Sequence, residues 1–283
     1  MTIFLPIALG TLFGVSMVLF LLFLAAILLS RAIGGEVRRM RELPASPAPY
    51  VPADPASLPA PVARYLTVCG ALDREPVKVA RVLHGGGFSP SPDKPLHIEG
   101  MQYFSADPPG FVWWGRIRVA PWVYVDGRDS SIGGVGRMVV KAVGLFTVGD
   151  SAGERMDEGS LMRLLGELVW LPTALADSRY VRWTAMDDHA AAATITVGKV
   201  SATLIFRFGE DGFPLSVEGL RWRDLGGGNA TLTPWYGLLS DYREVGGLKV
   251  PFALSANWLF DGRTFEYARW EVAKLEFDNP ATW

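Results

Sequence analysis

Two short motifs in this sequence match the working parts of a serine esterase. GDSAG, at 149–153, has the GxSxG spacing of a nucleophile elbow, in which a serine stands on a tight turn between a strand and a helix. HGGGF, at 84–88, matches the HGGG turn whose backbone N–H groups stabilise the oxyanion in such enzymes. Together the motifs predict hydrolysis of an acyl ester, with Ser151 as the nucleophile.

The order and spacing of the motifs resemble the hormone-sensitive-lipase-like α/β hydrolases, but the rest of that chemistry is missing. Ser151 needs a general base, and His189 is the only histidine that follows it. Asp188 is adjacent to His189, so on a strand the two side chains would point to opposite faces. The residues GERMD also separate the serine from the first helical pattern. We therefore interpret His84 as a strand-end histidine and the glycines as turn residues, and keep a Ser151–His189 esterase as the enzyme alternative.

The amino-acid composition limits which other kinds of functional site the chain can form. Cys69 is the single cysteine, which excludes an intrachain disulfide and a thiolate cluster. The three histidines, His84, His97 and His189, lie far apart and lack HExxH spacing, so we expect no metal and no cofactor. A formal net charge of −2 and a pI near 6.0 provide no basic surface for nucleic acid.

Aromatic side chains are the other chemically informative feature. The chain has ten tryptophans, fifteen phenylalanines and eight tyrosines, many on apolar faces of predicted strands. Most of them should fill the core. A more specific hypothesis is that a curved sheet closed by one helix leaves a cavity with aromatic walls. We expect such a cavity to bind an apolar ligand, a lipid or acyl chain, through Phe104, Trp113, Leu161, Leu165, Trp170, Phe206, Phe252 and Trp258.

The N-terminus is apolar for long enough to cross a membrane. No charged side chain occurs before Arg31, and residues 4–29 would extend roughly 39 Å as a helix. A cleaved signal peptide is the alternative, but it needs basic residues before a shorter apolar run, whereas here the basic residues follow the run. We predict a single-pass anchor at residues 1–33.

Four arginines follow this segment, Arg31, Arg38, Arg39 and Arg41. By the positive-inside rule they favour a cell inner membrane protein with its globular part in the cytoplasm, and a periplasmic or extracytoplasmic domain is the alternative. Residues 34–60 then form a basic flank and a proline-rich stalk, with seven prolines between Glu42 and Pro61.

The remaining residues, 61–283, are predicted to form a single β-rich domain. After a short helix that begins near Pro61, the hydrophobic period changes to two, as in antiparallel strands with short connections. One helix interrupts the strands at 157–170, with Asp157 as its cap, and Asp261–Gly262 predicts a hairpin near the end. About ten strands and one amphipathic helix predict a mainly β fold, a curved antiparallel half-barrel with the helix covering it.

Three separated stretches also carry a resemblance: LPAPVARYL at 58–66, QYFSADPPGFVWW at 102–114 and PTAL at 172–175. They resemble an uncharacterised bacterial family of membrane-anchored proteins, and that resemblance implies no activity. The expected architecture is similar to the lipoprotein-localisation-factor-like half-barrels, whose concave side holds acyl chains. The likeness is one of architecture alone, because fold does not imply function. A structural module that binds a protein partner is the third alternative.

Overall fold

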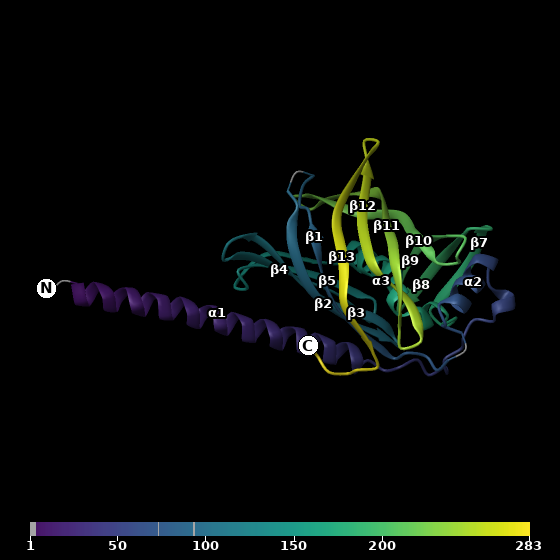
Figure 1. The fold of residues 1–283 in the computed structure, drawn as a ribbon, viewed down its shortest axis with the longest axis horizontal. Helices are drawn as coiled ribbons and strands as arrows, with labels where there is room; N and C mark the ends of the chain where they lie inside the picture. Colours follow the sequence, from purple (N-terminus) through teal and green to yellow (C-terminus); the bar gives the residue numbers. More distant parts are fainter. Residues whose placement is uncertain (1–3, 73, 93) are drawn as a thin grey trace.

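The computed structural model describes residues 4–72, 74–92 and 94–283. Within these residues the chain forms thirteen strands in one antiparallel sheet (Figure 1), more than the ten or so predicted. One additional strand arises because residues 136–148, whose period-two pattern predicts a single strand, break in two at Val143 and Gly144, which both have positive φ. Another is the strand at 229–245, which the prediction lacks and which contains Pro234, a residue type that is rare inside strands.

The sheet consists of two meanders that meet in its middle. The first is β1 Val79–Phe88, β2 Leu96–Ala106, β3 Pro109–Ala120, β4 Val123–Ile132, β5 Val135–Ala142 and β6 Phe146–Ala152. The second is β7 Val181–Asp187, β8 Ala190–Val197, β9 Val200–Phe208, β10 Pro214–Gly226, β11 Asn229–Val245, β12 Leu248–Phe260 and β13 Arg263–Phe277. Because β1 pairs with β13, the edges of the sheet are β6 and β7.

The helices connect and cover this sheet. They are α1 Phe4–Arg41, the 3-10 turn η1 Pro55–Ser57, α2 Ala60–Val68, α3 Glu154–Glu167, the 3-10 turn η2 Leu168–Trp170 and α4 Pro172–Leu175. The segment from α3 to α4 joins β6 to β7, and α3 lies inside the curve of the sheet (Figure 1). The fold is therefore a curved antiparallel half-barrel with a helix across its concave face, as predicted.

The start of α3 differs from the prediction. The helix begins at Glu154, and Gly153, with φ 101°, is its N-cap in place of Asp157. The carboxylate of Asp157 instead accepts a hydrogen bond from the backbone N of Gly136 at 2.7 Å. Asp157 thus joins the first turn of α3 to β5.

The concave face contains the main core. Leu161, Leu164 and Leu165 of α3 are completely buried against strand residues that include Leu204 and Val217. Complete burial of one such leucine stabilises the fold by about 1.5–3 kcal/mol. The leucine stripe therefore fixes α3 against the inner wall of the sheet.

The convex face has a smaller core beneath α1. Ile33, Val37 and Met40 follow one another at helical spacing and are buried. They pack against outward-facing strand residues, Tyr103, Val112 and Ile132. Since Arg128 of β4 also pairs with Glu36 at 3.1 Å, the C-terminal half of α1 is attached to the domain.

The described part of the chain contains one helix, α1, that is long and apolar enough by length and composition to cross a membrane. Its proline-rich continuation lies along the domain: the backbone N of Ala53 donates to Ala176 O, and Ser178 N donates to Val51 O. Further along, Asp261 and Gly262 both have positive φ in the predicted hairpin turn between β12 and β13.

Candidate functional site

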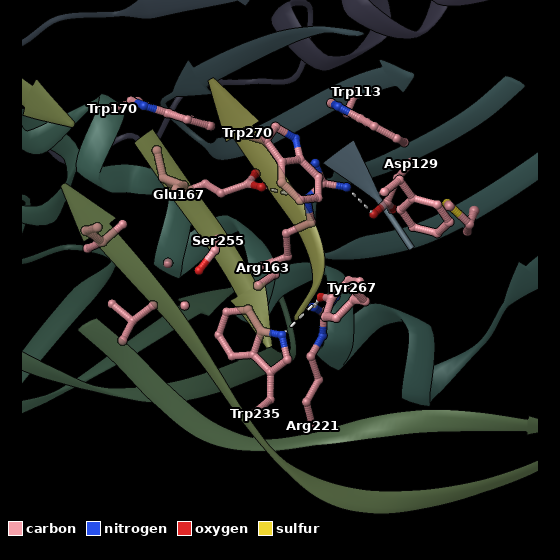
Figure 2. Close-up of a pocket in the computed structure, with 18 residues that line it drawn as sticks. Trp113, Asp129, Arg163, Glu167, Trp170, Arg221, Trp235, Ser255, Tyr267 and Trp270 are labelled. Atoms are coloured by element: carbon pink, nitrogen blue, oxygen red, sulfur yellow. Dashed lines mark hydrogen bonds and ion pairs between the residues drawn. The ribbon is translucent and has the colours of Figure 1, made fainter. Parts of the chain in front are cut away.

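A cavity of about 190 Å³ lies on the concave side of the sheet, between α3 and strands β10–β13 (Figure 2). Four tryptophans, from β3, η2, β11 and β13, form much of its wall: Trp113, Trp170, Trp235 and Trp270. Aliphatic side chains, including Leu239 and Leu254, complete the apolar lining. Such walls suit an apolar group that fits between the rings.

Glycines create the space that Trp113 and His84 occupy. The strand register pairs His84 with Gly100, Gly100 with Gly115, and Gly115 with Gly127, a row across β1 to β4. A Cβ at Gly115 would lie 2.2 Å from the Trp113 ring, and one at Gly100 would lie 2.5 Å from His84 Nε2. Side chains at either position would displace these rings.

His84 and Trp113 meet in the space above this glycine row. Trp113 Nε1 donates to His84 Nε2 at 2.8 Å, and the two rings are nearly parallel, with an interplanar angle of 7°. Burial lowers the pKa of His84 to about 3, with a smaller lowering from the charge of Arg163 and an opposing hydrogen bond to Gly85 O. The imidazole is therefore neutral, as an acceptor for the indole must be.

A buried charged network forms the part of the cavity wall next to α3. Arg163 donates to Asp129 Oδ2 at 2.8 Å and to Glu167 Oε1 at 2.9 Å. Gln102 joins it by donating to Glu167 Oε2 at 2.6 Å and accepting from Arg163 at 3.2 Å. Burial alone would lower the pKa of Arg163, but the two carboxylates raise it above its usual value. The polar groups of this network pair with one another, so we assign the network a structural role.

The opposite wall carries polar groups with fewer partners. Trp235 Nε1 donates to the hydroxyl of Tyr267 at 3.0 Å, and Arg221 donates to the same hydroxyl at 3.3 Å (Figure 2). Within the described residues, Arg221 forms no ion pair, and its other hydrogen bond is to Gly159 O at 3.4 Å. Trp270 Nε1 is buried and has no hydrogen-bond partner. Arg221 is therefore the charged group of this wall that can still interact with a polar end of a ligand.

A second, larger cavity of about 450 Å³ lies beneath the proline-rich segment. Its charged groups largely pair with one another: Arg179 contacts Asp177 at 2.6 Å and Asp107 at 2.9 Å. Tyr50 crosses it to donate to Thr173 O at 3.2 Å. We take the tryptophan-lined cavity as the candidate site because its apolar walls are continuous with the concave face.

The structure brings some of the predicted ligand-binding residues together. Trp113 and Trp170 line the cavity. The other six do not line it: Phe104, Leu161, Leu165 and Phe206 are completely buried in the core, and Phe252 and Trp258 are partly buried on β12. Because residues on one strand face diverge along a curved sheet, a shared face did not imply a shared cavity.

Sequence reasoning missed the charged network and two tryptophans that line the cavity, Trp235 and Trp270. A polar residue at a core-facing strand position was the available signal: Gln102 shares its face with Phe104 and is completely buried. Asp129 forms an ion pair with Arg163. That partner, 34 residues away on another element, could not be identified from local spacing.

The two esterase motifs occupy places unlike those in an esterase. Ser151 is exposed on the edge strand β6, although α3 does begin three residues later, contrary to our expectation for GERMD. His189 is in the β7–β8 turn at the opposite edge of the sheet order, 3.8 Å from Glu210. In the described part of the chain no hydrogen bond joins the two side chains.

The HGGGF motif forms neither the oxyanion turn of an esterase nor the strand end and turn that we expected. His84 is buried inside β1 and is not at a strand end. The three glycines that follow it pair with residues 269–271 of β13, so they are sheet residues and not turn residues. Their backbone groups therefore belong to the sheet and do not form an oxyanion turn.

Two observations bear on metal and thiol chemistry. Among the described residues, no group of three or more His, Cys, Asp or Glu side chains is placed to hold a metal ion. Cys69 is buried against α2, and burial raises the pKa of its thiol to about 12. The thiol is thus protonated at neutral pH and unreactive.

The fold and its cavity define a half-barrel with an aromatic pocket under the helix that crosses it. The chain belongs to the family of unknown function DUF6544, whose model matches residues 48–270, which confirms the resemblance to an uncharacterised family. No curated protein sequence matches the chain.

Two solved structures are similar to this one. A LolA superfamily protein from Nitrosomonas europaea has 9% sequence identity and a TM-score of 0.36, over 76% of this chain and 94% of that one. A beta-barrel-like protein of the domain of unknown function DUF1849 from Brucella abortus has 12% identity and a TM-score of 0.23, over 73% of this chain and 100% of that one.

Proposed function

We propose that this protein binds an apolar ligand in the tryptophan-lined cavity while α1 anchors it in a membrane. The observation that carries the proposal is the composition of the cavity wall, in which four indole rings and aliphatic side chains surround about 190 Å³. The polar groups next to α3 are already paired with one another, so an apolar guest leaves none of them without a partner.

The volume of the cavity limits the size of the bound group. An engineered apolar cavity of about 150 Å³ in another protein binds benzene. A cavity of about 190 Å³ accordingly suits a small apolar molecule or one segment of an acyl chain. Trp113 and Trp170 would contact that segment, with Arg221 beside its polar end.

Photolabelling tests the proposal. We would incubate the full chain in lipid nanodiscs with a diazirine-bearing palmitic acid and identify the labelled peptides by mass spectrometry. Adducts on β10 to β13 are expected, and Ala256→Phe, which enlarges a cavity-lining side chain, should remove them. Ala185→Phe, at an exposed position of β7, is the matched control and should leave them unchanged.

Labelling that does not depend on the cavity would overturn the proposal of ligand binding. Adducts confined to α1, or equal labelling of both phenylalanine variants, would show that the fatty acid contacts the protein only from the bilayer. Extraction of the purified protein with organic solvent adds a second readout. An acyl species retained by Ala185→Phe and lost from Ala256→Phe would identify the natural ligand.

We also propose an inner-membrane location with the domain, residues 61–283, on the cytoplasmic side. The supporting observations are the apolar length of α1 and the arginines that follow it, including Arg38 and Arg39, which are exposed. Alkaline phosphatase fused after Trp283 should be inactive in cells, because the enzyme needs an oxidising compartment. Full phosphatase activity would place the domain on the other side.

A further inference from the structure

Two hairpin ends of the first meander are apolar and open to solvent. The connection between β3 and β4 exposes Trp122, whose side chain is 96% exposed, and the β5–β6 hairpin exposes Phe146 at 67%. Their exposed apolar neighbours are Val119, Val123, Leu145 and Val148. We call these six residues the hairpin patch. Large contiguous apolar patches are uncommon on the surfaces of monomeric soluble proteins, and they mark interaction sites.

The hairpin patch lies beside the apolar part of α1. A Cβ at Gly144, in the β5–β6 turn, would be 3.6 Å from the Cβ of Ala25 and 3.6 Å from the hydroxyl of Tyr124. In β3, on the N-terminal side of the hairpin patch, Trp114 and Arg116 line a small cavity together with α1 residues 26, 29 and 30. The β4 side of the sheet extends along α1 toward its N-terminal part (Figure 1).

The length of α1 that precedes Ala25 matches a bilayer. Ala25 is buried by the domain, whereas preceding large side chains such as Leu19, Phe20 and Phe23 are exposed. From Phe4 to residue 24 the helix has about 21 residues and is roughly 31 Å long. The hydrocarbon core of a typical bilayer is about 30 Å thick. Ala25, which contacts the domain, therefore lies where a bilayer around residues 4–24 would end.

We propose that the hairpin patch inserts into the surface of the bilayer that α1 crosses, an inference that rests on the membrane anchor proposed above. Residues 114–125 and 139–149 contain no acidic side chain, and Arg118 and Lys141 lie within them, which favours phosphate headgroups as neighbours. Asp126, the next residue, is buried and pairs with Arg116 at 2.9 Å. Tryptophan is enriched at the boundary between headgroups and acyl chains. The occupant of the patch is thus a lipid surface, and α1 with two hairpins holds the domain in one orientation.

Site-directed spin labelling of the full chain tests this docking. Nitroxides are attached to Trp122→Cys and Phe146→Cys, with the protein in nanodiscs of phosphatidylethanolamine and phosphatidylglycerol. Cys69 stays in place because it is buried and its thiol is protonated. Phe20→Cys, on the free part of α1, and Met186→Cys, exposed on β7, provide the internal references.

The measurement is the collision rate of each label with oxygen, which concentrates in lipid, and with a nickel chelate, which stays in water. Labels at 122 and 146 are expected to lose most of their nickel collisions, as at 20, while the label at 186 keeps them. If 122 and 146 behave like 186 and 20 is protected, the docking is wrong and the anchor stands. If 20 is also open to nickel, both the anchor and the docking are wrong.

Discussion

The indole Nε1 of Trp113 donates to Nε2 of His84 across an intervening strand, at 2.8 Å. The contact is made above Gly100 of β2, where any larger residue would place its Cβ within 2.5 Å of the same imidazole nitrogen. His84 therefore serves as a buried acceptor that orients one wall of the cavity. The HGGGF motif, which suggested an oxyanion turn, forms part of the inner surface of the sheet.

Neutral His84 should make the protein less stable in mild acid. Its pKa is about 3 in the folded chain, below the ordinary value of 6.5, so below pH 6.5 the unfolded chain binds a proton that the folded chain does not. This contribution is complete above pH 6.5 and is lost as the pH falls toward 3, by up to about 1.4 kcal/mol per pH unit. Denaturant unfolding in detergent at pH 7, 6 and 5 measures it.

His84→Gln is the informative variant for this pH dependence because glutamine accepts a hydrogen bond and does not titrate. The stability difference between wild type and His84→Gln should shrink as the pH falls from 7 to 5. His97→Gln replaces an exposed histidine and serves as the control. A difference that stays constant over this range for His84→Gln would show that His84 has the same pKa in the folded and the unfolded chain.

The glycine row makes a separate prediction about packing. Gly115→Ala would place a methyl group 2.2 Å from the Trp113 ring, and the resulting overpacking should destabilise the fold by about 1–3 kcal/mol. Gly149→Ala is the matched control, since its Cβ would meet only Val140, at 3.5 Å. Equal melting temperatures of the two variants would mean that Trp113 moves freely from its position.

Local patterns in the sequence were sufficient to predict much of the fold. The period-two strands, the leucine stripe of α3 and the Asp261–Gly262 turn are set by neighbouring residues, and all three are present. The prediction failed where a local rule had an exception. Pro234 lies inside β11, and Gly153 starts α3 from a backbone conformation with positive φ.

The candidate site was much harder to predict because it depends on long-range register. Trp235, Trp270 and Arg221 come from three strands of the second meander, and Trp113 comes from the first. Their meeting requires the pairing of β1 with β13, which local periodicity does not reveal. A polar residue at a core-facing strand position, Gln102, was an unused signal that the concave face is more than a uniform apolar core.

Arg163 should be essential for stability because it is the cation between two largely buried carboxylates. Arg163→Met leaves Asp129 and Glu167 without their partner and should cost about 3–5 kcal/mol of unfolding free energy. The control is Arg207→Met at the exposed Arg207–Glu218 pair, which should cost at most about 1 kcal/mol. Similar losses in both variants would contradict the buried network.

The structure also predicts how Ser151 responds to an esterase reagent. A fluorophosphonate reacts with a serine only when a neighbouring base removes its proton, and Ser151 is an exposed residue of an edge strand with His189 placed in the β7–β8 turn. Native protein and Ser151→Ala should therefore show the same, background labelling, with a known serine hydrolase as positive control. Labelling of the native protein that Ser151→Ala and His189→Ala both abolish would establish an active serine. The edges β6 and β7 would then have to approach each other in the reacting protein, and the cavity would become the place where an acyl substrate binds.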